Sequence, residues 1–367
     1  MGLIALGVSH GDRIGIMAGN CAEYISVFFA AARVGAVIVV LNTTYTATEL
    51  EYAVAHTSCK ILFITPQIGR HDNTTFLDAN GTPQSPMLEI IIILRGTYST
   101  FPTYRNLIMA GRVIDPARLR SAEAKCNTHD LVNLQFTSGS TGQPKAAMLS
   151  HHNLVNNSLF IGQRLDFGTE DILCCPPPLF HCFGLVLGLL ACVNWGASIV
   201  LPSETFDAQA VQKAINTYNC TALHGVPTMF VALLALSRPK GWKSSLRTGI
   251  IAGAPVPGPL MQRLFDDLGM RNYTSSYGLT EASPTCFNAF THTPLELRIA
   301  TVGKLMPHIH AKIVAPGGGT DPLPIGDRGE LCISGYSLSA GYFLNDEKTA
   351  EAFVVHPDGK RWLHTGR

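Results

Sequence analysis

Short apolar runs alternate with helical patterns along most of this chain, and this alternation limits the possible fold more than any other feature. The runs are rich in β-branched residues and lack the polar alternation of half-exposed strands, which predicts strands buried on both faces. The expected strands are 12–19, 35–42, 60–65, 89–94, 197–202, 221–226 and 248–253, and the expected helices are 21–35, 46–57 and 207–219. Strands and helices in this order form parallel sheets covered by helices, so the predicted fold class is α/β with two such sheets.

The pattern changes after about residue 295. Residues 311–335 are rich in glycine and proline and contain short β-forming stretches without a helical pattern, which predicts an antiparallel, barrel-like subdomain. We therefore expect an α/β core of two interwoven subdomains in residues 1–295 and a β-rich subdomain in residues 296–367. Residues 96–112 are predicted to be a polar, irregular connection.

The composition excludes two classes of partner. The net charge is +1 and charged residues make up only 14% of the chain, so neither nucleic acid nor an anionic membrane surface is an expected partner. The apolar segment 179–201 contains His181, Asn194 and a turn-forming Gly196, which favours a buried helix followed by a buried strand over stable membrane insertion. The ten cysteines form no CxxC pair, which predicts reduced core thiols in an intracellular protein.

Residues Thr137 to Lys145, TSGSTGQPK, form a polar, glycine-rich stretch in an apolar chain. We expect a strand before this stretch and a helix after it, at residues 150–165. Glycines let backbone N–H groups approach anionic oxygens, hydroxyls add donors, and Lys145 adds a mobile cation, so the stretch is predicted to hold phosphate groups. It is not a Walker A loop, because Gln143 and Pro144 separate the last glycine from the lysine. A flexible surface turn is the alternative.

This stretch resembles the signature loop of the adenylate-forming (AMP-binding) superfamily, which contains acyl-CoA synthetases, luciferases and the adenylation domains of peptide synthetases. Three further segments resemble the family's motifs in the family's order: AGAP at 252–255, SSYGLTEAS at 275–283 and the GEL…GY stretch at 329–353. Ala146 departs from the glycine that is common after the lysine. The sequence is most similar in style to medium-chain fatty acyl-CoA synthetases and to fungal acyl-CoA ligases of secondary metabolism.

The resemblance implies a site for ATP and Mg²⁺. The implied nucleotide-binding residues are Thr137, Ser138, Gly139, Ser140, Thr141, Gly142, Lys145, Gly253, Ala254, Pro255, Ser276, Tyr277, Gly278 and Thr280. The β- and γ-phosphates are implied to lie against Ser138, Thr141 and Lys145, and the α-phosphate against Thr280. Tyr277 and Ala254 would contact the adenine, since an aromatic face suits a nucleobase, and Glu281 would bind the metal, since carboxylate oxygens are ligands for Mg²⁺. The implied catalytic residues are His181, Lys145, Thr280 and Glu281.

The acid substrate is implied to lie near PLFHCFG, residues 178–184, where the family has an aromatic or histidine motif. His181 would lie between the nucleotide and the acyl pocket, and a histidine satisfied within the core is the alternative. No acidic residue occurs between Ile172 and Pro202, so the ammonium group of an amino acid would lack a partner there. Because a buried unpaired charge is costly, an apolar acyl chain is the better expectation.

Together the resemblances imply ATP-dependent activation of a fatty or other apolar carboxylic acid to an acyl-adenylate, followed by acyl transfer to coenzyme A. The family has an aspartate where this sequence has Arg367, so the usual contact with the ribose hydroxyls is not expected. The family's small C-terminal domain is absent from these residues, and we expect a fragment of a ligase. The alternative is a short protein that binds nucleotide or acyl groups without full turnover. The expected location is cytoplasmic or peroxisomal.

Overall fold

The structure, a computed structural model, describes residues 1–367 except 79–81, 83–84, 138–142, 238–243 and 367. The chain divides into two compact units. Unit 1 comprises Met1–His151, Pro178–His181 and Ser203–Thr205, and unit 2 comprises His152–Pro177, Cys182–Pro202 and Phe206–Arg367. The subdomain boundary expected near residue 295 stays a prediction.

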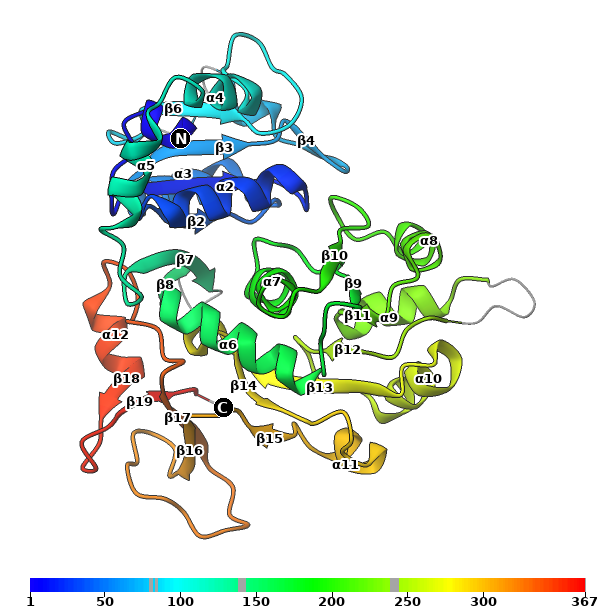
Figure 1. The fold of residues 1–367 in the computed structure, drawn as a ribbon. Coiled ribbons are helices and arrows are strands. Elements are labelled where there is room, and N and C mark those ends of the chain that lie inside the picture. The colour runs from blue at the N-terminus through cyan, green and yellow to red at the C-terminus, as the bar shows by residue number, and fades with distance from the viewer. Residues whose placement is uncertain (79–81, 83–84, 138–142, 238–243, 367) are drawn as a thin grey trace. The chain divides into compact units, whose positions relative to one another are not determined.

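Unit 1 is built on a six-stranded sheet with the strand order β6-β3-β1-β2-β7-β8 (Figure 1). Its strands are β1 (Arg13–Met17), β2 (Val37–Val40), β3 (Cys59–Ile64), β6 (Ile90–Ile93), β7 (Leu131–Thr137) and β8 (Lys145–Ser150), and β4 (Gln67–Ile68) pairs separately with β5 (His71–Asp72). All neighbours in the large sheet are parallel except β7 and β8. Every residue of β2 is buried, as are Ile14 and Ile16 of β1, which confirms the prediction of strands covered on both faces.

Helices α2 and α3 of unit 1 confirm the two helices predicted at 21–35 and 46–57, and the other helices of this unit were not predicted. The full set is α1 (Gly2–Ala5), α2 (Ala22–Arg33), α3 (Ala47–His56), the 3₁₀ turn η1 (Thr74–Phe76), α4 (Tyr104–Gly111) and α5 (Pro116–Glu123). The capping box of α3 forms as predicted, because the Thr46 backbone N–H donates to Glu49 and the Glu49 N–H donates to the Thr46 hydroxyl. The prediction of an irregular connection at 96–112 is wrong for its second half, which forms helix α4. Its reciprocal cap pairs Thr103 with Asn106, an amide shorter than the usual Glu or Gln at this position.

Unit 2 contains a seven-stranded sheet with the order β10-β9-β11-β12-β13-β14-β15. Its strands are β9 (Ile172–Cys174), β10 (Ser198–Val200), β11 (Ala222–Leu223), β12 (Thr248–Ile251), β13 (Asn272–Gly278), β14 (Thr285–Asn288) and β15 (Lys304–Leu305). Its helices are α6 (His151–Arg164), the π-helix η2 (Phe183–Leu190), α7 (Ala191–Trp195), α8 (Ala208–Tyr218), α9 (Pro227–Leu234), α10 (Gly258–Leu268), the 3₁₀ turn η3 (Thr280–Ala282) and α11 (Leu295–Ala300). The strands from β10 to β13 are parallel, and β14 and β15 are antiparallel, so a second mostly parallel sheet is confirmed.

The apolar segment 179–201 folds into η2 and α7 followed by strand β10, and the residues of η2 are buried as predicted. The expected burial of the strand is wrong, because β10 lies at an edge of the sheet with Ser198 exposed and Ile199 and Val200 half-buried. The turn between α7 and β10 is at Gly196, whose φ of 68° is a left-handed conformation that glycine adopts without strain. None of the helices in the described part of the chain combines the length and the apolarity that a bilayer crossing requires.

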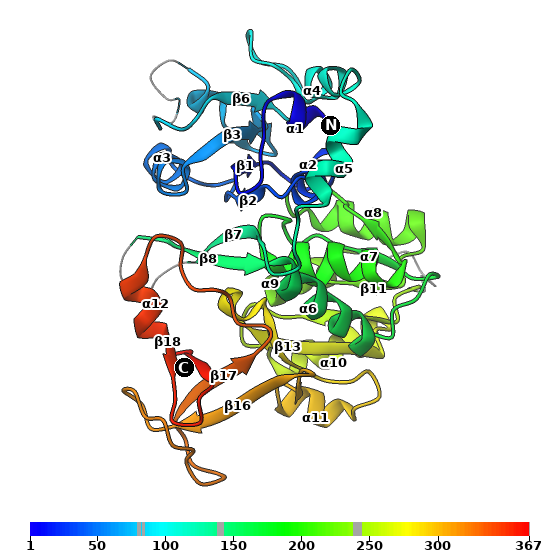
Figure 2. The same cartoon turned by 60° about the vertical axis from the view of Figure 1, so that its left-hand side comes forward.

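The last part of unit 2 is an antiparallel sheet with the order β16-β17-β19-β18 (Figure 2). It comprises β16 (Ile309–Val314), β17 (Glu330–Gly335), β18 (Phe353–Val355) and β19 (Arg361–His364), with helix α12 (Asp346–Ala352) leading into β18. The antiparallel character is confirmed, but the described strands form an open sheet with β16 and β18 at its edges instead of the expected barrel-like closure.

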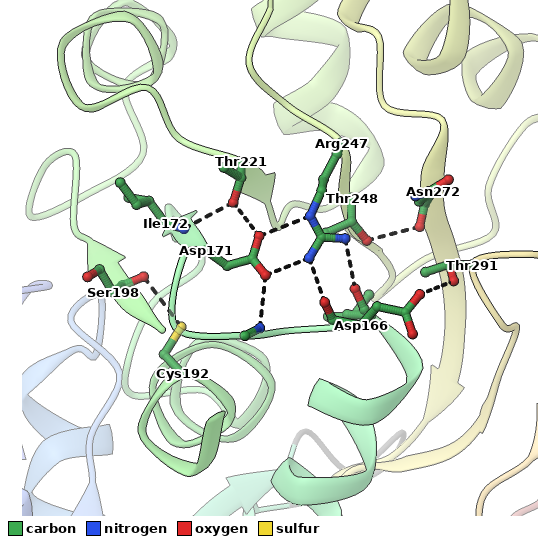
Figure 3. A network of polar contacts seen from close by, with 12 residues as sticks. Asp166, Asp171, Ile172, Cys192, Ser198, Thr221, Arg247, Thr248, Asn272 and Thr291 are labelled. Atoms are coloured by element: carbon green, nitrogen blue, oxygen red, sulfur yellow. Dashed lines mark hydrogen bonds and ion pairs between the residues drawn. The ribbon is translucent and has the colours of Figure 1, made fainter. Parts of the chain in front are cut away.

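A polar network ties together the amino ends of the parallel strands in unit 2 (Figure 3). Arg247, just before β12, donates through Nε and Nη2 to both carboxylate oxygens of Asp171, just before β9, at 3.0 and 2.5 Å. Thr221, just before β11, donates to the same carboxylate at 2.6 Å, and Arg247 also reaches the backbone carbonyls of Leu165 and Asp166 at the end of α6. Charge-assisted hydrogen bonds therefore stabilise the amino edge of this sheet. Ligands of open α/β sheets bind at the opposite, carboxyl edge.

Candidate functional site

The carboxyl ends of β12 and β13 bring two of the predicted motifs together. The strands are parallel neighbours, with Ile251 paired to Ser275, so the segments that follow them leave the same edge of the sheet. After β12 the chain bends at Gly253, whose φ of 87° requires glycine, and Ala254 and Pro255 are exposed. In open α/β sheets ligands bind outside this edge of the strands. The predicted adenine-binding positions are therefore placed where a nucleotide can reach them.

Strand β13 ends in a tight reversal that places Thr280 and Glu281 on a single helical turn. The Leu279 N–H donates to the Pro284 carbonyl at 2.9 Å, and a Cβ on Gly278 would lie only 1.9 Å from that same oxygen. Only glycine fits so close to the Pro284 carbonyl, which explains why position 278 is a glycine. The ring of half-buried Tyr277 meets Phe287 edge-on, with centroids 6.1 Å apart, and the Ser276 hydroxyl lies 3.3 Å from that of Thr285.

Glu281 is a nearly buried carboxylate at 9% exposure. Its Oε1 accepts a hydrogen bond of 2.7 Å from the Tyr342 hydroxyl, and its backbone carbonyl accepts one of 2.8 Å from the Ser339 N–H. Among the described residues, no donor reaches the other oxygen, Oε2, and no Lys, Arg or His forms an ion pair with this carboxylate. A buried carboxylate that lacks a cationic side chain suits a hard divalent cation, so the donor set fits the predicted Mg²⁺.

The segment predicted to lie near the acid substrate, residues 178–184, contains the exposed side chain of His181 followed by the buried one of Cys182. His181 is exposed and its backbone N–H donates to the Pro178 carbonyl, so the alternative of a buried core histidine is wrong. Cys182 is buried, and its sulfur lies 3.7 Å from the Thr280 hydroxyl oxygen. His181 and Lys145 belong to unit 1, whereas Thr280 and Glu281 belong to unit 2. Their joint action therefore stays a prediction.

The phosphate-loop prediction needs one correction. Thr137 ends β7 and Lys145 begins β8, and the two residues pair across an antiparallel hairpin in which the Thr137 hydroxyl donates to the Lys145 carbonyl at 3.4 Å. Strand β8 therefore stands between the loop and helix α6, because Ala146, Ala147 and the following apolar residues pack into the sheet instead of leaving it. The predicted helix at 150–165 forms as α6, but it follows strand β8 and not the loop itself. Ser138 to Gly142 lie outside the described residues.

Two buried asparagines on α6, Asn153 and Asn157, contact the segments that follow β17 and the Glu281 turn. The sequence analysis did not predict their role. Asn157 donates to the Thr285 carbonyl at 2.9 Å and accepts from the Thr285 N–H at 3.2 Å. Asn153, one turn earlier, donates to the Tyr336 carbonyl at 2.6 Å. These bonds fix α6 to the first residue of β14 and to the residue that follows β17. The available signal was a pair of amides four residues apart on one helix face.

His224 fixes the π-helix that follows His181. Its Nδ1 accepts from the Ile250 N–H at 3.2 Å, so its Nε2 carries the proton and donates to the Leu187 carbonyl of η2 at 3.0 Å. The imidazole also stacks on Phe167 and Phe183. Complete burial disfavours the charged imidazolium and lowers the pKa of His224 to about 4. The hydrogen bond to the Leu187 carbonyl acts in the opposite direction but has the smaller effect.

This shift predicts a loss of stability in weak acid. Between pH 6.5 and about 4 the unfolded chain binds a proton at His224 that the folded chain does not, so the free energy of unfolding falls as the pH falls through this window. The contribution is roughly 3 kcal/mol in total. Urea unfolding at a series of pH values should show a flatter dependence in His224→Gln than in the wild type, because glutamine does not titrate. Equal slopes in the two proteins would contradict the assignment.

Residues 1–343 match the family described as AMP-binding enzyme, and the chain belongs to this family. It is 61% identical, over 371 residues, to the acyl-CoA ligase sidI of Aspergillus fumigatus, covering 100% of this chain and 62% of that protein. It is 33% identical, over 380 residues, to the mitochondrial medium-chain acyl-CoA ligase ACSF2 of Danio rerio, again covering 100% of this chain and 62% of the relative.

A crystal structure of a long-chain-fatty-acid-CoA ligase (FadD1) from Archaeoglobus fulgidus superposes with a TM-score of 0.85 at 22% identity, covering 100% of this chain and 71% of that chain. This likeness confirms the predicted fold of two mostly parallel, helix-covered sheets. The chain spans less than two thirds of the length of the curated relatives reported above.

Proposed function

We propose that these residues are the nucleotide- and acid-binding part of an acyl-CoA ligase, which activates an apolar carboxylic acid with ATP and passes the acyl group to coenzyme A. The observation that carries the proposal is the Gly253 bend beside the Tyr277–Glu281 turn at one sheet edge, with a buried carboxylate that no cationic side chain of the described residues neutralises. The similarity to proteins named acyl-CoA ligases over the whole chain supports the same reading.

In the proposed first step an oxygen of the substrate carboxylate attacks the α-phosphorus in line, the bond to the bridging oxygen breaks, and pyrophosphate leaves. The chain's task is to position the reactants and to offset developing charge. Tyr277 and Ala254 would hold the adenine, Thr280 the α-phosphate, and Lys145, with the hydroxyls of the loop before it, the departing phosphates. A divalent cation bound at Glu281 would neutralise part of the phosphate charge.

The acid is proposed to be apolar. All residues of η2 are buried and apolar, and the segment from Ile172 to Pro202 contains no carboxylate that could pair with a substrate ammonium group. The nearest acidic residue before this segment, Asp171, is already engaged by Arg247 and Thr221 at the opposite, amino edge of the sheet. A substrate amine would therefore be desolvated without a partner.

An intracellular location, cytoplasmic or peroxisomal, is proposed with this function. None of the ten cysteines, all of which lie in the described residues, forms a disulfide, and nine of them are buried. Thiols in this state are typical of proteins from reducing compartments.

The test compares two acids that differ by one amino group. Exchange of radiolabelled pyrophosphate into ATP is measured with isocaproate and with leucine, its 2-amino derivative, and the thermal midpoint is measured with and without Mg·ATP. We expect exchange with isocaproate and none with leucine. A Mg·ATP-dependent rise in the midpoint without exchange for any acid would favour the alternative of a binding protein that lacks turnover. If the protein shows no exchange with any acid and no rise in the thermal midpoint with Mg·ATP, the proposal is refuted.

A further inference from the structure

We infer that Tyr342 is a positioning residue for the metal-binding carboxylate of Glu281. The inference rests on the proposed function, and it assigns a task to a residue outside the predicted site. Tyr342 lies 61 positions after Glu281, in the segment between β17 and α12, yet its hydroxyl is 2.7 Å from Glu281 Oε1.

The hydrogen bond joins an uncharged donor to a carboxylate. The Tyr342 hydroxyl donates and Oε1 of Glu281 accepts, so the negative charge of the carboxylate has no cationic partner in this contact. A neutral donor orients the carboxylate without cancelling that charge, whereas a Lys or Arg partner would compete with a cation.

The contact also distinguishes the two carboxylate oxygens. Oε1 is occupied by Tyr342, and Oε2 has no donor within the part of the chain that the structure describes. A glutamate side chain has three rotatable bonds, so a single fixed oxygen limits the positions that the second can take. The second oxygen is thus presented in one orientation.

Tyr342 is itself firmly held. Its side chain is 3% exposed and its ring meets Phe353 edge-on at 5.9 Å between centroids. Its backbone N–H donates to the Thr349 hydroxyl at 2.9 Å, and that hydroxyl donates to the Asn345 carbonyl at 2.8 Å. The preceding Gly341 has a φ of 132°, and a Cβ there would approach Thr349 to 2.5 Å. The start of α12 therefore fixes the tyrosine, and the tyrosine fixes the glutamate.

The experiment measures metal dependence without turnover. Binding of an ATP analogue with a methylene bridge between the α and β phosphorus atoms is followed by calorimetry while Mg²⁺ is titrated. In Tyr342→Phe the ring and its packing remain and only the donor is lost, so the Mg²⁺ concentration for half-maximal binding should rise by about tenfold or more. Affinity for the analogue in excess EDTA should not change. Thr349→Val, which keeps the phenol but removes its backbone anchor, should give a smaller rise in the same direction.

The matched control is Tyr98→Phe. The Tyr98 hydroxyl also donates to a carboxylate, Asp78, at 2.7 Å, but it belongs to unit 1 and to none of the predicted site. Its loss should leave the Mg²⁺ requirement unchanged. If the wild type binds the analogue and Tyr342→Phe has the same Mg²⁺ requirement, the role of Tyr342 is overturned while the proposed function stands. If the wild type does not bind the analogue with Mg²⁺, the proposed function fails and the role fails with it.

Discussion

Replacing Glu281 by glutamine is expected to slow acyl-adenylate formation by about 100-fold or more. Glutamine has nearly the same shape and can still accept the Tyr342 hydrogen bond, so the Glu281 turn should keep its structure. The change removes a negative charge that no cationic side chain in the described residues neutralises. The nucleotide then loses the charge that would hold a divalent cation beside its phosphates.

The measurement is carboxylate-dependent pyrophosphate exchange at several Mg²⁺ concentrations. Part of the lost rate should return at high Mg²⁺, because a weakened metal site is filled by mass action. Glu296→Gln, at an exposed position in the first turn of α11, is the control and should exchange at the wild-type rate. A Glu281→Gln protein as active as this control at low Mg²⁺ would show that the carboxylate has no part in the reaction.

The elements that the sequence predicted well are those with local causes. Strands β2 and β3 are runs of apolar residues buried on both faces, and α3 begins at a capping box formed by residues three positions apart. Strand β8 was missed because its apolar residues directly follow a polar loop and were read as part of the connection to α6. Helix α4 was missed because the asparagine in its cap does not give the usual signal.

The parts of the site that the sequence did not reveal depend on contacts between distant positions. The Tyr342–Glu281 bond spans 61 residues, and the Asn157–Thr285 pair spans 128. Nothing in the sequence around Tyr342 distinguishes it from a core aromatic residue. A resemblance to family motifs identified Glu281, but only the fold identifies the residue that orients it.

Arg247→Met is expected to lower the free energy of unfolding by about 3 kcal/mol. The reason is the asymmetry of the ion pair, since the Asp171 side chain is 7% exposed and that of Arg247 is 34% exposed. Without the guanidinium, the buried carboxylate keeps two donors among the described residues, the Thr221 hydroxyl and the Gly168 N–H. The carbonyls at the end of α6 also lose their partner, so the loss exceeds that of a surface pair.

The control is Arg263→Met, which removes an exposed pair with Asp267 one helical turn away and should change the free energy by about 0.5 kcal/mol or less. The double variant Asp171→Asn/Arg247→Met should be more stable than Arg247→Met alone, because it no longer buries an unpaired charge.

The stabilisation by this ion pair also depends on pH. Burial favours the neutral acid, but the bonds from Arg247 and Thr221 outweigh it and hold the pKa of Asp171 below its ordinary 3.8. The stabilisation is therefore complete above that pH and is lost as the pH falls below it, so the wild type and Arg247→Met should converge in acid. Urea unfolding followed by circular dichroism measures each difference, and equal stabilities of the two arginine variants at neutral pH would show that the network does not hold the amino edge of the sheet.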